Sequence, residues 1–310
     1  MLFLPYKLDV SLYRIPLLTA LVMLVCLFTF LSQKSSSDVF QTRVIGYCGE
    51  ALEPNLAAIL RRIESRSDTA TACVKVFMAL RNSKTPETDA AALAASARGL
   101  VFYRDPQQNQ QYLSDKLLRG LADFELQVPR QLTESLQYEP GQYSLPRMIS
   151  SVFAHADWGH LLGNLFFFYI FASCVESALG HLHFALSIVV MAVASSLAYS
   201  YSAGAGAALP TIGLSGVAMG MMALIGTLLP HAKVRCLFWF LLWIRRFSLP
   251  LLLIALWYIG WNVYDFHNDD GSSHINYMAH VSGAATGVVL GLLYRWFAAE
   301  RVQQASLGVA

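Results

Sequence analysis

Apolar residues gather in long runs along this chain, and polar residues separate the runs. A helix that crosses a membrane needs about 20 mostly apolar residues. The pattern predicts six membrane crossings, of which the fifth is short. We place them at residues 15–31, 160–178, 184–201, 213–229, 249–263 and 278–297. A further apolar run, 236–244, is too short to span, and we expect it at the membrane interface or at a helix end.

The first apolar run, residues 15–31, has two interpretations. It is long for the apolar core of a signal peptide, and no small-x-small cleavage site precedes Gln33-Lys34. We therefore favour an uncleaved membrane anchor. A cleaved signal peptide is the competing interpretation.

Residues 34–145 differ in character, because most of the charged side chains lie there. Helical periodicity marks 56–63 and 112–126, and 90–97 is rich in good helix formers. The stretch predicts a small, mostly helical, water-soluble insertion. Its two cysteines are Cys48 and Cys73, which either form a disulfide or remain free thiols.

The composition supports a membrane protein. Of 310 residues, 55% are hydrophobic and only 14% are charged, against about 25% charged residues in soluble domains. Mean hydropathy is +0.46. A net charge of +2 without a basic stripe argues against a nucleic-acid partner, and five cysteines without a C-x-x-C pair argue against zinc or thiol redox chemistry. The histidines and aspartates of 265–274 fit no compact metal-ligand spacing.

Charge placement predicts one topology. Lys7 and Arg14 precede the first crossing, which favours a cytoplasmic N-terminus. The cations of later loops fall on that same side, after crossings four and six: Lys233, Arg235, Arg245, Arg246, Arg295 and Arg301. We expect a cytoplasmic N-terminus (1–14), a first membrane helix (15–32), an extracytoplasmic insertion (34–145), a five-helix core (146–298) and a cytoplasmic tail (299–310).

Polar side chains open three of the predicted crossings. His160 and Asn164 lie in crossing two, Ser215 opens crossing four, and His280 opens crossing six. All three crossings run from outside to inside, so these side chains are expected at similar depth. Polar groups inside membrane segments are costly and are by default candidates for function. The absence of acidic residues in mid-crossing, and of an obvious repeat, argues against a transporter.

Small residues predict which helices touch. Gly216 and Gly220 form a small-xxx-small ridge on crossing four, and Gly283, Gly287 and Gly291 form one on crossing six. Such ridges let helix backbones approach closely in lipid. Close approach would bring the serine and the histidine within hydrogen-bond reach.

That pair predicts nucleophilic catalysis. A serine hydroxyl needs a base to take its proton, and His280 is the candidate base for Ser215. An oxyanion formed by the attack needs fixed donors. We expect them from the Ser215 backbone N–H, His160 and Asn164, with Gly213 as part of this support. No aspartate is obviously placed to orient His280, so the sequence predicts a dyad.

Three motifs in order identify a resemblance. They are His155, His160 and Asn164; Gly213-Leu214-Ser215-Gly216; and Ala279-His280 with Gly283 and Gly287. Glu176, Gly180 and Arg147 also fit the pattern. In this combination the chain resembles the rhomboid family of intramembrane serine proteases.

The resemblance implies an all-α, polytopic, six-helix bundle with a cavity that opens outward. It implies a Ser215–His280 dyad, no metal or cofactor, and substrates in the lipid bilayer that are membrane proteins with a transmembrane helix. We interpret His155, Arg147 and Glu176 as structural. The loop 265–277 is expected to be a mobile segment beside the active site. The bacterial inner membrane is the expected location, and an organelle membrane is the alternative.

Two residues depart from the family pattern. Pro146 stands where a tryptophan usually precedes the arginine, and Met219 stands where an aromatic often packs on the catalytic histidine. They keep a second interpretation open, in which the chain is an inactive relative that binds transmembrane segments as a chaperone or adaptor.

Overall fold

The computed structural model describes residues 2–10, 15–50, 52–203, 209–240, 243–269, 273 and 275–297. Parts of the sequence discussed above lie outside these residues: Arg14, then Asp270, Gly271-Ser272 and His274 of the loop 265–277, and Arg301 with the rest of the tail 299–310. The chain divides into two compact units. One comprises Met1–Leu31 with Ser135–Ala310, and the other is Ser32–Glu134.

The predicted all-α, polytopic bundle is confirmed. Helices occupy the six predicted crossings: α1 (Leu17–Ile45), α8 (Trp158–Leu179), α9 (His181–Ala203), α10 (Ser215–Leu228), α11 (Leu251–Asn268) and α12 (Tyr277–Phe297). Within the described residues, α1, α8, α9 and α12 are long and apolar enough to cross a membrane. Helix α10 is apolar but has only 14 residues.

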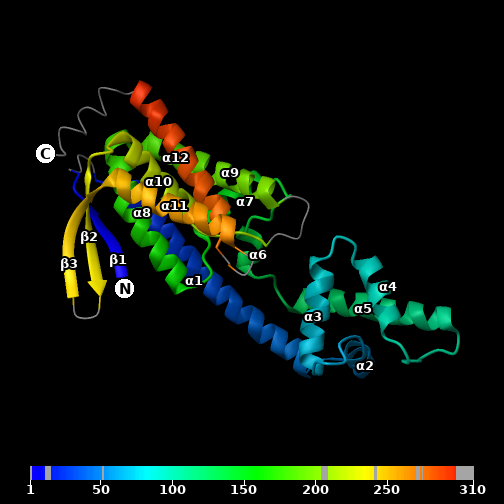
Figure 1. Ribbon diagram of the computed structural model, residues 1–310. Helices are drawn as coiled ribbons and strands as arrows, with labels where there is room; N and C mark the ends of the chain where they lie inside the picture. The colour runs from blue at the N-terminus through cyan, green and yellow to red at the C-terminus, as the bar shows by residue number, and fades with distance from the viewer. Residues whose placement is uncertain are drawn as a thin grey trace. The chain divides into compact units, whose positions relative to one another are not determined.

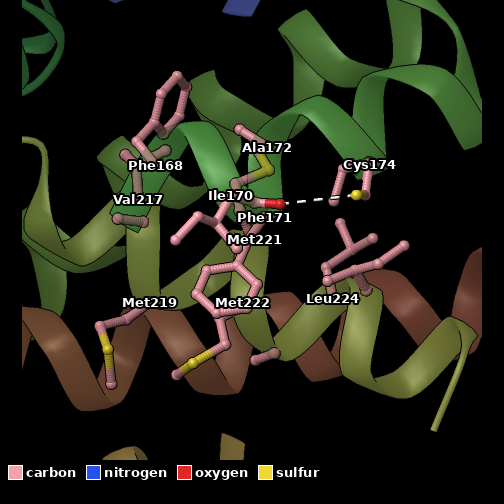
Figure 2. Close-up of a cluster of buried hydrophobic side chains, with 14 of the residues drawn as sticks. Phe168, Ile170, Phe171, Ala172, Cys174, Val217, Met219, Met221, Met222 and Leu224 are labelled. Atoms are coloured by element: carbon pink, nitrogen blue, oxygen red, sulfur yellow. Dashed lines mark hydrogen bonds between the residues drawn. The ribbon is translucent and has the colours of Figure 1, made fainter. Parts of the chain in front are cut away.

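The core of the first unit lies where α8 meets α10. Figure 2 shows Phe168 and Phe171 of α8 gathered with Met221, Met222 and Leu224 of α10. All five side chains are buried. Helix α10 buries nearly all of its residues, which makes it the central helix of the bundle.

Helix α1 runs antiparallel to α8. Near its start, the Thr19 backbone and hydroxyl donate to the Glu176 carboxylate at the end of α8. Further along, the Phe30 ring lies 4.8 Å from that of Trp158, at the start of α8. These two contacts lie at opposite ends of α8, so they hold α1 alongside α8 over most of the length of α8.

A three-stranded antiparallel sheet, not expected from the sequence, lies beside the bundle (Figure 1). Its strands are β1 (Leu2–Leu8), β2 (Lys233–Phe240) and β3 (Trp243–Pro250), in that order. The described residues of the apolar run, 236–240 and 243–244, therefore belong to strands rather than to a helix end. Val234 and Cys236 are buried while Lys233 and Arg235 are exposed, and this alternation is the period of a strand.

The second unit is a small helical domain around its own core. After α1 come the π-helix η1 (Gly46–Glu50), α2 (Pro54–Ile63), α3 (Thr69–Asn82), α4 (Pro86–Ser96) and α5 (Pro106–Gln127), and α6 (Leu132–Leu136) begins in it. The three predicted helical stretches of the insertion are thus confirmed. Phe77 stacks on Phe124 with ring centroids 5.4 Å apart, and a disulfide joins Cys48 to Cys73.

Candidate active site

Ser215 and His280 meet at the start of two helices. Ser215 is the first residue of α10, and His280 lies in the first turn of α12. Ser215 Oγ lies 2.7 Å from His280 Nε2, within hydrogen-bond distance. This distance meets the requirement for a serine nucleophile that is activated by a neighbouring base.

The glycine ridges explain how the two helices come so close. A Cβ atom on Gly283 would overlap the carbonyl oxygen of Gly216, and one on Gly287 would overlap that of Gly220. Because only hydrogen stands at these positions, α10 and α12 touch backbone to backbone. A third contact, of Gly291 with Thr227, continues the same seam.

A second link holds the segments that precede the two helices. Asn276 accepts a hydrogen bond from the Ala279 backbone N–H (2.9 Å), which caps the start of α12. The Asn276 side-chain amide donates to the hydroxyl of Thr211 at 3.0 Å, and Thr211 lies four residues before Ser215 in the chain. Thr211 in turn exchanges two backbone hydrogen bonds with Tyr138. No motif or spacing in the sequence marks Asn276 or Tyr138 as part of the site.

The far side of the His280 ring also has a partner that was not predicted from the sequence. His280 Nδ1 lies 2.7 Å from Asn262 Oδ1 of α11. The Asn262 amide donates to the Tyr258 carbonyl at 2.8 Å. The Tyr277 ring stands edge-on to His280, with centroids 6.4 Å apart. The only available sequence signal was an amide within an apolar helix.

His160, Asn164 and Gly213 converge beside the serine. Gly213 has a φ of +121°, a conformation that other residues rarely adopt. A Cβ atom there would lie 2.7 Å from His160 Nε2 and 3.4 Å from Asn164 Nδ2. The Gly213 backbone N–H donates to the Ser151 carbonyl. Gly213 therefore contributes space for the other two side chains and donates no hydrogen bond of its own to the site.

The donors of His160 and Asn164 point into this space. His160 Nδ1 accepts from the Ala156 backbone N–H at 3.5 Å, so in the neutral ring the proton sits on Nε2. Asn164 is buried, and its Nδ2 has no hydrogen-bond partner among the described residues. A buried, unpaired donor is uncommon in a folded protein and calls for an explanation such as a catalytic role.

A small cavity lies behind the serine. Its volume is about 30 Å³, and the residues that line it include Ser195, Ser196, Gly213 and Ser215. The Ser195 hydroxyl is buried and has no partner within the described part of the chain. The lining includes serine hydroxyls, and a cavity of this size is large enough for a water molecule.

The remaining candidates have contacts that hold the fold. His155 is buried, donates from Nδ1 to the Phe153 carbonyl (3.2 Å) and lies 5.1 Å from the His160 ring. Burial, with His160 nearby, lowers the pKa of His155 to about 4. Arg147 pairs with Glu139 at 3.4 Å. Met219 is buried in the α10 core (Figure 2).

Glu176 serves the start of α1. Its carboxylate accepts from the backbone N–H groups of Leu18 and Thr19, from the Thr19 hydroxyl, and from His181 Nδ1 at 2.6 Å. The first N–H groups of a helix have no partner within the helix, and a carboxylate satisfies them well. Among the described residues, no three or more His, Cys, Asp or Glu side chains are grouped to hold a metal ion.

Comparison with known proteins shows the family of the chain. The family model of the Rhomboid domain matches residues 142–297, the stretch that contains Ser215, His280, His160 and Asn164. Rhomboid-like protein 11, chloroplastic, of Arabidopsis thaliana is 29% identical over 168 residues, covering 51% of this chain and 55% of that protein. The chain thus matches about half the length of this curated relative. The chain is an integral membrane protein that belongs to the rhomboid family.

Proposed function

We propose that the chain is an intramembrane serine protease in which Ser215 is the nucleophile and His280 the general base. The observation that carries the proposal is the 2.7 Å distance between Ser215 Oγ and His280 Nε2. Ser215 lies at the first position of α10, where the helix dipole favours developing negative charge.

Attack begins with transfer of the Ser215 proton to His280 Nε2 as Oγ bonds to the peptide carbonyl carbon. The resulting oxyanion needs donors that are already in place. Three groups are proposed to supply these donors: the Asn164 Nδ2–H, the His160 Nε2–H and the Ser215 backbone N–H. Because the Asn164 donor has no partner among the described residues, its hydrogen bond would form mainly in the transition state.

Collapse of the tetrahedral intermediate breaks the carbon–nitrogen bond. His280 returns its proton to the leaving amine, and the acyl group stays on Ser215 as an ester. A water molecule then gives a proton to His280 and attacks the ester, which releases the acid and restores the serine. The cavity of about 30 Å³ beside Ser215 could position that water.

The proposed substrates are membrane proteins cut in or near a transmembrane segment. We place the active site at the extracytoplasmic side of a bacterial inner membrane. The disulfide between Cys48 and Cys73 supports that side for the second unit, because disulfides persist in oxidising compartments. The described free cysteines, Cys26, Cys174 and Cys236, all belong to the first unit.

The test is covalent labelling and cleavage with purified protein. We expect a fluorophosphonate to label wild-type protein at Ser215, and a transmembrane peptide to be cut. Ser215→Ala should abolish both, and His280→Ala should reduce both to near background. Ser202→Ala, which removes an exposed hydroxyl of the neighbouring helix α9 away from this cavity, serves to verify that labelling is specific to Ser215.

A different outcome would support the inactive alternative. If the wild-type protein and both variants bind a transmembrane peptide equally and none cuts it or reacts with the fluorophosphonate, the chain is a binding protein rather than a protease.

A further inference from the structure

We propose that Asn262 is a positioning residue that completes a Ser215–His280–Asn262 arrangement. The inference rests on the proposed function, since it concerns how the base is held. It extends the dyad by a neutral third member, contributed by α11.

The hydrogen-bond directions follow from the partners. The Tyr258 backbone carbonyl can only accept, so the group of Asn262 that lies 2.8 Å away must be its NH₂. The Asn262 oxygen therefore faces His280 Nδ1, at 2.7 Å. An oxygen at this point accepts from Nδ1–H, and the neutral ring then keeps its lone pair on Nε2, toward Ser215.

Asn262 thus selects one of two tautomers of the base. With the proton on Nε2 instead, His280 could not accept the serine proton. In soluble serine proteases a buried aspartate holds the histidine in the same way. In a membrane helix a carboxylate is expensive, and an amide supplies the acceptor without the charge.

The same helix offers a matched control. Asn268, also on α11, donates from its amide to the carbonyl of Tyr264, four residues earlier, at 2.7 Å. This repeats the bond from Asn262 to Tyr258, but Asn268 is exposed and lies outside the site. Replacing each by leucine removes one such bond, and only the first change affects the histidine.

The experiment compares kcat and KM for a transmembrane peptide, together with the rate of fluorophosphonate labelling. We expect Asn262→Leu to lower kcat and the labelling rate by roughly 10²-fold, with KM little changed. Asn262→Asp, which keeps an acceptor oxygen, should retain activity within about tenfold of wild type. Asn268→Leu should match wild type.

Several results would overturn the inference. One is wild-type turnover by a folded Asn262→Leu protein. Another is an equal loss in Asn262→Leu and Asn262→Asp, which would mean that the acceptor oxygen is irrelevant, even if the leucine variant folds poorly. If wild-type protein itself neither cuts nor labels while Ser215→Ala behaves identically, the proposed function has failed instead.

A second inference rests on the sheet. Its register places four cations on one face: Lys7, Lys233, Arg235 and Arg246. All four are exposed, while Leu8, Val234 and Cys236 on the opposite face are buried in the bundle core. Asp9 pairs with Arg235 at 2.9 Å. Among the described residues the other three cations have no ion pair.

We propose that this basic face binds anionic phospholipid headgroups. Strand β3 leads directly into α11, so the sheet stands at the end of a bundle helix, where headgroups lie. Exposed lysines and arginines at that level attract anionic lipid. The partner is thus the surface of the membrane that holds the bundle.

The probe is dioctanoyl phosphatidylglycerol added to protein in a neutral detergent, with dioctanoyl phosphatidylcholine as the uncharged reference. We expect the anionic lipid alone to raise the melting temperature of wild-type protein. The combined variant Lys7→Gln, Lys233→Gln, Arg246→Gln should lose most of that rise. The control variant Arg61→Gln, Arg66→Gln, Lys84→Gln removes three exposed cations from the second unit and should keep it. An equal rise in all three proteins, or with both lipids, would contradict the proposal.

Discussion

Gly283 lies so close to Gly216 that any side chain on Gly283 would overlap the carbonyl oxygen of Gly216. This contact sets the separation of α10 from α12, and with it the distance from the proposed nucleophile to the proposed base. A rigid backbone atom cannot move aside as a flexible side chain can. The helices themselves must separate to admit even one methyl group.

We therefore expect Gly283→Val to abolish labelling of Ser215 and to lower the melting temperature, with a cost of about 1–3 kcal/mol or more. Gly287→Val should act in the same way against Gly220. Gly260→Ala, on α11, is the control, because a Cβ atom there would meet nothing within 4 Å. Full labelling by a folded Gly283→Val protein would show that the seam does not set the catalytic distance.

Substitution of Asn164 should lower the rate of catalysis without lowering the stability of the fold. The Asn164 Nδ2 has no partner among the described residues, so Asn164→Ala removes no hydrogen bond of that group from the resting protein. We expect kcat to fall about 10²–10³-fold, with KM and melting temperature nearly unchanged. A large drop in melting temperature at unchanged kcat would assign Asn164 to the fold.

Glu176 should behave in the opposite way. Glu176→Ala would leave the first N–H groups of α1 without their acceptor, at a cost of roughly 2–4 kcal/mol. The measurement is thermal or denaturant unfolding in detergent, followed by Ser215 labelling of the protein that remains folded. Labelling per folded molecule should stay near wild type. Glu64→Ala, which breaks an exposed pair with Lys75, should change stability little.

Protonation of His155 should make the stability of the fold depend on pH in the acid range. The pKa of His155 is about 4 in the fold, against 6.5 for an ordinary histidine. Between these values the unfolded chain binds a proton that the folded chain does not, so stability falls as the pH falls from about 6.5 to about 4. The shift is worth up to about 3 kcal/mol. Melting temperatures of wild type and His155→Gln across this range test it: the variant should lose less stability in acid, and parallel curves would contradict the assignment.

The helices of the bundle could be predicted from the sequence because long apolar runs and glycine spacing are local signals. Three of the predicted crossings run in the same direction through the membrane. Each has one of the site residues His160, Ser215 and His280 near its start, so the topology alone predicts that these residues lie at a similar depth in the membrane. The spacing Gly283-Gly287 against Gly216-Gly220 also carried information on which helices touch.

The role of Asn262 and the presence of the sheet could not be predicted from the sequence, for physical reasons. Periodicity does not reveal how α11 is rotated, so nothing local shows that Asn262 faces His280 rather than lipid. Pairing of β1 with β2 joins residues more than 220 positions apart in the sequence. Strand β1 and the run 236–244 are each too short to reveal a partner, and pairing depends on contacts that no window contains.

The pairing of β1 with β2 also has a consequence for the order in which the protein is made. The first strand leaves the ribosome long before its partner, Lys233–Phe240, has been synthesised. Until then the edge of β1 has no strand to bind, while α1, α8, α9 and α10 are already available for membrane insertion. The beginning of the chain thus finds its place only after most of the bundle exists, and closing the sheet is a late step in assembly.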